Sequence, residues 1–111
     1  MSVASDLRAA LASTGYPIEQ GLYTGSAATY ITFNFSTLPD LFGDNEPGYE
    51  RYLIQVHLIA PAKTDTTTMQ ESVKALLVAG GFDYPATTNA SDDPAEQHIV
   101  FETETAVYIG A

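Results

Sequence analysis

The residues best able to do chemistry are two histidines, His57 and His98, and the carboxylates that precede the second of them. In the order Asp92-x-x-x-Glu96-x-His98, oxygen and nitrogen ligands could meet at one metal ion, but the spacing matches no zinc or calcium loop. The chain has no cysteine, which excludes thiolate metal sites, disulfides and cysteine nucleophiles. We therefore expect no metal and no cofactor, and we interpret residues 92–98 as a solvated acidic loop.

Patterns for acid–base or nucleophilic catalysis are equally weak. Glu102 and Glu104 lie about 7 Å apart on one strand face, a spacing that could suggest an acid/base pair. No partner groups accompany them in the sequence, so we interpret them as solvent-facing charges. Gly25-Ser26 is an ordinary turn rather than a nucleophile elbow, and no glycine loop precedes a helix to hold phosphate. We predict a protein that is not an enzyme and has no catalytic residues.

The composition describes one small acidic domain over residues 1–111, with 45% hydrophobic residues for a core. No apolar run approaches the ~20 residues of a membrane span, and the first residues lack a secretory signal pattern, so we expect a cytosolic product without membrane contact. Fourteen acidic against four basic residues give a net charge of −10, which argues against wrapping nucleic acid. Solubility, a salt-rich environment or an acidic host would each explain this charge. The functional alternative is a surface that repels something anionic.

The hydrophobic pattern predicts the elements that position these side chains. One helix begins at the cap Ser5 and stops at Gly15, and a second has Thr68 and Glu71 at capping-box spacing and ends at Gly80. Strands are predicted at Ile18–Tyr23, Ala28–Phe35, Tyr49–Ala60 and His98–Ile109, with a shorter one at Phe82–Pro85. The first two strands are expected to form a hairpin, and the polar residues 84–97 a loop.

The strand over residues 49–60 has the clearest alternation. Tyr52, Ile54, Val56 and Leu58 point to one side and are predicted to hold the core. We predict an α+β two-layer sandwich, in which a mostly antiparallel or mixed sheet of four to five strands carries both helices on one face.

The segment Leu38–Gly48, rich in proline and glycine, is predicted to be a loop that cannot continue the sheet. A loop of this length favours a functional role, so we expect it to contact a partner. The candidate interface residues are Leu41, Phe42, Asp44, Asn45, Glu46 and Tyr49. Deleting Phe42–Glu46 is expected to leave a folded protein that cannot assemble.

The order of elements resembles a known family over nearly the whole chain. The residues that carry the likeness are the L-x-x-x-L helix, the Gly-Tyr-Pro break, ATYITFNF, Phe42-Gly43-Asp44-Asn45, YLIQVHL, ESVKALLVAGGF and FETETAVYI. This pattern is similar to the tail terminator and tail completion proteins that join head and tail in long-tailed bacteriophages. The polar stretch between Tyr84 and Gln97 matches no motif of that pattern.

The resemblance implies a structural virion protein of the phage tail, assembled in the host cytoplasm. Its copies would form a hexameric ring on the tail tube protein and meet the head–tail connector proteins. DNA would pass through without specific binding, and acidic residues would line that lumen; the candidates are Asp40, Asp44, Glu46, Glu102 and Glu104. The competing hypothesis is a small acidic adaptor or inhibitor that mimics DNA and binds a basic protein.

Overall fold

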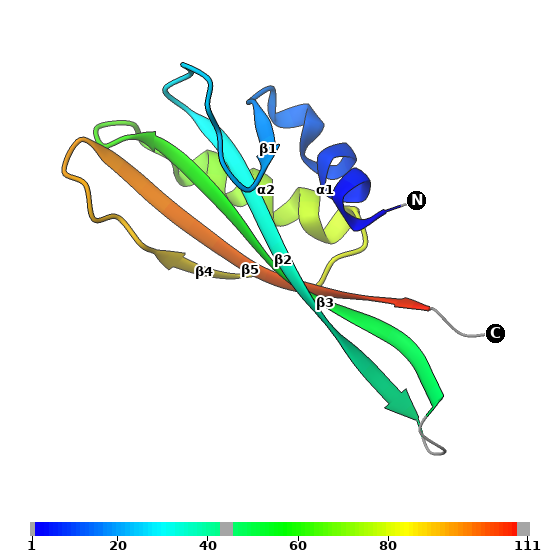
Figure 1. Ribbon diagram of the computed structural model, residues 1–111. Helices are drawn as coiled ribbons and strands as arrows, with labels where there is room; N and C mark the ends of the chain where they lie inside the picture. Colours follow the sequence, from blue (N-terminus) through cyan, green and yellow to red (C-terminus); the bar gives the residue numbers. More distant parts are fainter. Residues whose placement is uncertain (1, 43–45, 109–111) are drawn as a thin grey trace.

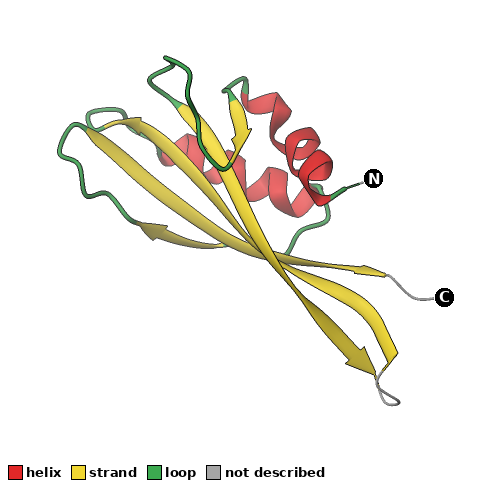
Figure 2. Cartoon of the chain, in the orientation of Figure 1, coloured by secondary structure: helices red, strands yellow, loops and turns green. Residues whose placement is uncertain are grey.

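The computed structural model describes the backbone of residues 2–42 and 46–108 (Figure 1). It describes the side chains of residues 2–38 and 48–107. Within these residues the chain forms two α-helices, a 3-10 turn and one five-stranded sheet of order β1-β2-β3-β5-β4. The elements are α1 (Val3–Leu11), η1 (Ala12–Thr14), β1 (Ile18–Gln20), β2 (Tyr30–Phe42), β3 (Glu46–Pro61), α2 (Thr67–Ala79), β4 (Ala86–Asn89) and β5 (Glu96–Tyr108). Both α-helices lie on one face of the sheet (Figure 2). The predicted α+β fold is confirmed.

The core forms where the helices cover the sheet. Alternate residues of β2, β3 and β5 face the helices, and each helix contributes an apolar stripe. The buried set comprises Val3, Leu7, Leu11, Ile31, Phe33, Ile54, Val56, Leu58, Val73, Leu77, Phe82, Ile99 and Phe101. The prediction that Ile54, Val56 and Leu58 hold the core is confirmed, and Tyr52 packs at its margin.

Both helix starts differ from the prediction. Ser2, not Ser5, is the N-cap of α1, and its Oγ accepts the Ser5 backbone N–H at 3.1 Å. Helix α2 begins one residue before Thr68, so the predicted capping box does not form. Instead, the Asp65 carboxylate accepts the Thr67 backbone N–H at 3.0 Å. Asp65 was missed because an acceptor placed before the N-cap produces no capping-box spacing.

The predicted hairpin between the first two strands is wrong, because β1 pairs with β2 in parallel. Gly21, at φ +81°, turns the chain after β1, and its N–H bonds to the Phe33 carbonyl at 2.8 Å. Residues 22–29 then carry the chain back to the start of β2. Tyr23 stacks on Tyr30 with ring centroids 4.3 Å apart, and the Tyr23 hydroxyl accepts the Ala27 N–H. These contacts hold the connection against the sheet.

The prediction of a loop over Leu38–Gly48 is also wrong. Strand β2 continues to Phe42 and β3 begins at Glu46, with a register shift at Asp40/Leu41. Pro39 is tolerated because odd residues of β2 direct their backbone groups away from β3. Among the described residues no strand pairs with Pro39 on that side, so its missing N–H leaves no bond unmade. Proline in an edge position reads as a loop signal in the sequence although the strand continues through it.

The prediction of a loop over residues 84–97 is wrong in part, because this stretch contains a strand. Strand β4 covers Ala86–Asn89, whereas the predicted strand Phe82–Pro85 is absent from the assigned elements of the described chain. Strand β5 begins at Glu96, two residues before the predicted start. Neither helix in the described ranges has the length and apolar character needed to cross a membrane.

The three central strands extend far beyond the helices (Figure 1). We call this extension the arm: residues 36–42 of β2, 46–53 of β3 and 104–108 of β5. The molecule measures 53 × 25 × 25 Å and has a radius of gyration of 15.3 Å. A compact domain of this length would have a radius of about 13 Å, so the arm makes the molecule elongated.

Candidate assembly surface

The arm leaves both faces of its sheet uncovered. Four large side chains of the arm are 36–42% exposed: Leu38, Tyr49, Leu53 and Val107. Leu38 and Leu53 lie on the face turned away from the helices, and Val107 lies on the other face. A strand is normally covered on at least one face, so an extension that is bare on both faces is suited to contact another molecule.

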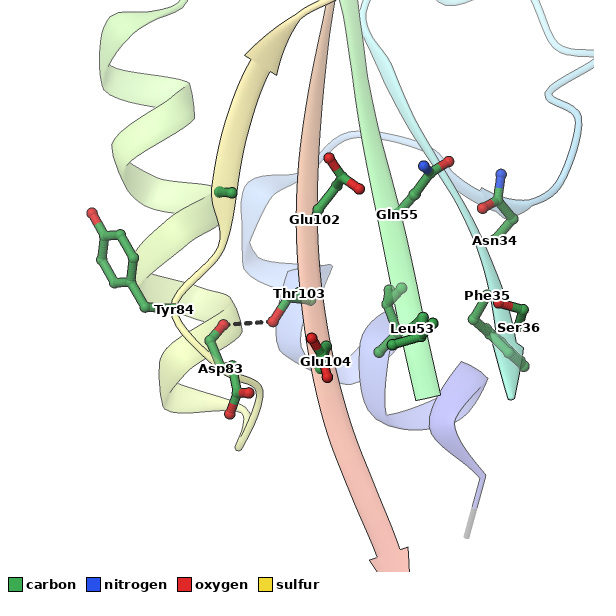
Figure 3. Close-up of a pocket in the computed structure, with 12 residues that line it drawn as sticks. Asn34, Phe35, Ser36, Leu53, Gln55, Asp83, Tyr84, Glu102, Thr103 and Glu104 are labelled. Carbon is green, nitrogen blue, oxygen red and sulfur yellow. Dashed lines mark hydrogen bonds between the residues drawn. The ribbon is translucent and has the colours of Figure 1, made fainter. Parts of the chain in front are cut away.

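A hollow of about 730 Å³ lies where the arm meets the body (Figure 3). Its floor on the open face consists of two rows across β2, β3 and β5: Asn34, Gln55 and Glu102, then Ser36, Leu53 and Glu104. Asp83 and Tyr84 form a wall, and the Thr103 hydroxyl donates to the Asp83 carbonyl. Tyr84 is 72% exposed. The lining offers amide, hydroxyl and carboxylate groups, which can form hydrogen bonds with the polar surface of another protein.

Glu104 has a partner that the sequence did not indicate. The Arg51 guanidinium donates to its carboxylate at 3.0 Å from the neighbouring strand β3. Both side chains remain more than a third exposed, so the pair stabilises the fold little. It does neutralise one of the two strand carboxylates, which corrects our interpretation of Glu104 as a charge without partner groups.

The predicted interface residues gather on the arm as far as the structure describes them. Leu41 and Phe42 end β2, and Glu46 begins β3 in register with Phe42. Tyr49 lies opposite Asp40 and is exposed. Asp44 and Asn45 lie outside the described residues.

The acidic lumen candidates are spread over two regions of the sheet. Asp40 and Glu46 are strand residues of the arm, and Glu104 begins the arm's share of β5. Glu102 lies nearer the body, in one row with Asn34 and Gln55, and is exposed on the open face. Glu102 and Glu104 both lie on the open face of the sheet, two residues apart on β5.

The two histidines, which the sequence left apart, meet on the open face. His57 Nδ1 and His98 Nε2 are 2.7 Å apart, and Asn34 Nδ2 lies 3.4 Å from His57 Nε2. Burial, followed by the neighbouring His98, lowers the pKa of His57, so His57 is neutral at neutral pH. The two histidines line a second hollow on the open face, together with Tyr30 and Glu96. Burial raises the pKa of Tyr30, with a smaller effect from Glu96.

This cluster does not assemble the metal ligands considered from the sequence. In residues 2–42 and 46–108, no three His, Asp or Glu side chains lie close enough to hold an ion. Asp93 instead accepts the Ala95 N–H and shapes the turn before β5. The missed signal was strand parity: His57 and His98 both fall on polar-facing positions, but only the β3–β5 pairing places them side by side.

Comparison with known proteins shows a shared fold and gives no information on activity. No family model and no curated protein matches this sequence. One similar solved structure, whose name describes no function, is 17% identical, with a TM-score of 0.60 over 99% of both chains. At this identity the likeness shows a shared fold alone.

Proposed function

We propose that this protein is a tail terminator or tail completion protein of a long-tailed phage. Its copies close into a ring, expected to be hexameric, on the end of the tail tube. The ring stops tube growth and joins the tail to the head connector. The protein acts by assembly and has no catalytic role.

The arm is the observation that carries the proposal. Three strands extend beyond the helices, and their apolar side chains Leu38, Leu53 and Val107 remain exposed. A compact adaptor would bury such residues in its own core, since an extension bare on both faces gains no burial in the monomer. Contact with neighbouring copies supplies that burial.

The acidic charge supports the same function. A conduit for DNA works best with walls that do not hold phosphate, and the chain has only four lysines and arginines. Arg51, on the arm, is engaged by Glu104, and Lys74, on α2, is engaged by Glu71 at 3.1 Å. We propose that Asp40, Asp44, Glu46, Glu102 and Glu104 include the lumen residues.

The test is assembly of the purified, untagged chain. Sedimentation velocity over a range of concentrations, alone and with tail tube protein of the same phage, should show a discrete ring that negative-stain microscopy displays with a central hole. A chain that stays monomeric with and without tubes would contradict the proposal. Monomers that instead bind a basic DNA-binding protein in competition with DNA would identify the mimic.

A further inference from the structure

The arm has two unpaired strand edges on opposite sides. Odd residues of β2 direct backbone groups outward, as the bond from Ile31 N–H to the Pro17 carbonyl shows. Strand β1 pairs only with Ile31–Phe33, so in the described chain no strand satisfies Phe35 and Thr37. Even residues of β5 face outward on the other side, and β4 pairs only as far as Glu102. Asp83 N–H occupies the Glu104 carbonyl at 3.0 Å, which leaves Ala106 open.

Within these two edges few of the usual protections against pairing occur, although Pro39 and the register shift at Asp40/Leu41 block the β2 edge beyond Leu38. Exposed edges are commonly guarded by charges, and 16% of this chain is charged. Yet Phe35–Leu38 and Thr105–Val107 contain no charged residue, and their Phe, Thr and Val residues favour strands. The two outer strands of the sheet, β1 and β4, are instead only three and four residues long. The two edges, four residues on β2 and three on β5, are uncharged and are therefore suited to pair with a short strand.

We propose that copies join through these edges, with β5 of one copy pairing in parallel with β2 of the next. This inference rests on the proposed ring and names its contact. Strands β2 and β5 are both antiparallel to β3, so they run in the same direction. Rotation about an axis along the arm keeps that direction in every copy, and a head-to-tail contact of this kind closes into a ring when the rotation between copies divides a full turn.

The register of the contact follows by elimination. In a parallel pair, one residue bonds to the carbonyl before and the N–H after the residue opposite it. Opposite Asn34, Ala106 would need the Phe33 carbonyl, which already accepts from Gly21. Opposite Leu38 it would need an N–H from Pro39, which has none. Ala106 therefore lies opposite Ser36, donates to the Phe35 carbonyl and accepts from the Thr37 N–H.

The faces of the two sheets agree in this register. Ser36 and Ala106 both lie on the open face, so the sheet continues without turning over. Val107 then comes beside Thr37 on the helix side, and the neighbouring copy covers part of its exposed surface.

Substitution by proline tests the contact one donor at a time. Thr37→Pro removes the outward N–H and leaves the bonds to β3 intact, because those belong to even residues. Thr37→Ala retains the N–H and is the matched control. We expect self-association to weaken about tenfold or more in Thr37→Pro and to stay near wild type in Thr37→Ala. Ala106→Pro and Ala106→Ser form the corresponding pair on β5, and circular dichroism checks that each variant folds.

Disulfide trapping tests the register. Because the chain has no cysteine of its own, only the introduced pair can form a disulfide. Ser36→Cys with Ala106→Cys places thiols on adjacent strands, whereas within one chain β3 separates them by about 10 Å, too far to bridge. Oxidation should give a covalent ladder that ends at the ring size. Leu38→Cys with Ala106→Cys, one pleat out of register, should give little.

The outcomes separate the two proposals. Rings that survive both proline variants and yield no ladder would overturn edge pairing and leave the terminator function standing. A disulfide between Ser36→Cys and a protein other than this chain, in place of the ladder, would also overturn it. A wild-type chain that forms no ring with or without tubes would contradict the function itself.

Discussion

At the scale of single residues, the His57–His98 contact is the main polar feature of the open face. The 2.7 Å separation needs one nitrogen to donate and the other to accept, so the contact fails when both rings are fully protonated. Charged and titratable groups near it include Tyr30, Glu96 and Glu102. The two rings come from strands 41 positions apart in the sequence, so no local pattern announces them.

The lowered pKa of His57 predicts a stability change in mild acid. The unfolded chain takes up a proton near the ordinary histidine pKa of 6.5, whereas the folded chain resists it. This contribution to the free energy of unfolding is therefore intact above pH 6.5 and decreases as the pH falls towards the folded pKa. Urea denaturation between pH 7.5 and 5, with EDTA present, measures it.

His57→Gln is the control for that experiment. The variant should lose part of the pH dependence, and His98→Gln should reduce it less, because burial is the larger cause. Equal slopes for wild type and His57→Gln would show that other groups produce the acid sensitivity.

The Phe101 side chain is expected to contribute strongly to the free energy of unfolding. It is fully buried in the centre of β5 between sheet and helices. Phe101→Ala should reduce the free energy of unfolding by about 3–5 kcal/mol, since it removes a large apolar contact and leaves a cavity. Val107→Ala, on the exposed arm, should change it by about 0.5 kcal/mol or less. A similar loss in both variants would mean that the arm is part of the monomer's cooperative core.

At the scale of elements, the body contains the hydrophobic core, whereas the arm offers surface for contacts. Helices cover β2, β3 and β5 only around the buried residues Phe33, Val56 and Phe101. The arm continues the same strands without such cover. Stability is therefore concentrated in the body, and the arm is free to serve contacts.

Shortening the tip of the arm separates ring formation from tube binding. Replacing Phe42–Glu46 by Asn-Gly, a favoured two-residue hairpin connection, removes the end of the arm and keeps the edges at Phe35–Leu38. From the sequence, loss of this segment was expected to prevent assembly. Because the edges at Phe35–Leu38 remain, we instead expect an unchanged melting temperature and intact rings that no longer bind tubes in co-sedimentation. Loss of folding would contradict this division, and retained tube binding would exclude the tip as the docking element.

At the scale of the whole molecule, the charge of −10 opposes association of identical copies. Salt screens this repulsion, with a Debye length of about 10 Å at 0.1 M. We expect the ring to form at lower protein concentration as NaCl rises from about 0.02 to 0.5 M. Sedimentation velocity at several concentrations measures the shift. Dissociation by salt would instead indicate contacts between opposite charges, against an uncharged edge-to-edge joint.

The fold class, the second helix and the apolar face of β3 were all predictable from the sequence. These follow from local periodicity, and the burial of Ile54, Val56 and Leu58 confirms them. The helix caps and strand ends were less predictable. Ser2 and Asp65 each accept one backbone N–H, and Pro39 lies in a strand position that needs no N–H. Such single positions produce no repeating pattern in the sequence.

The arm, the parallel pairing of β1 and the contact of His57 with His98 are evident only in the folded chain. Each depends on which strand lies beside which, and pairing between distant strands is set by packing of the whole sheet rather than by local preference. Leu41 and Phe42 were predicted to lie in a loop, whereas they end strand β2. Proline and glycine occur both in loops and on unpaired strand edges, because backbone groups face solvent in both. The strand pairing of the folded chain is needed to tell the two apart.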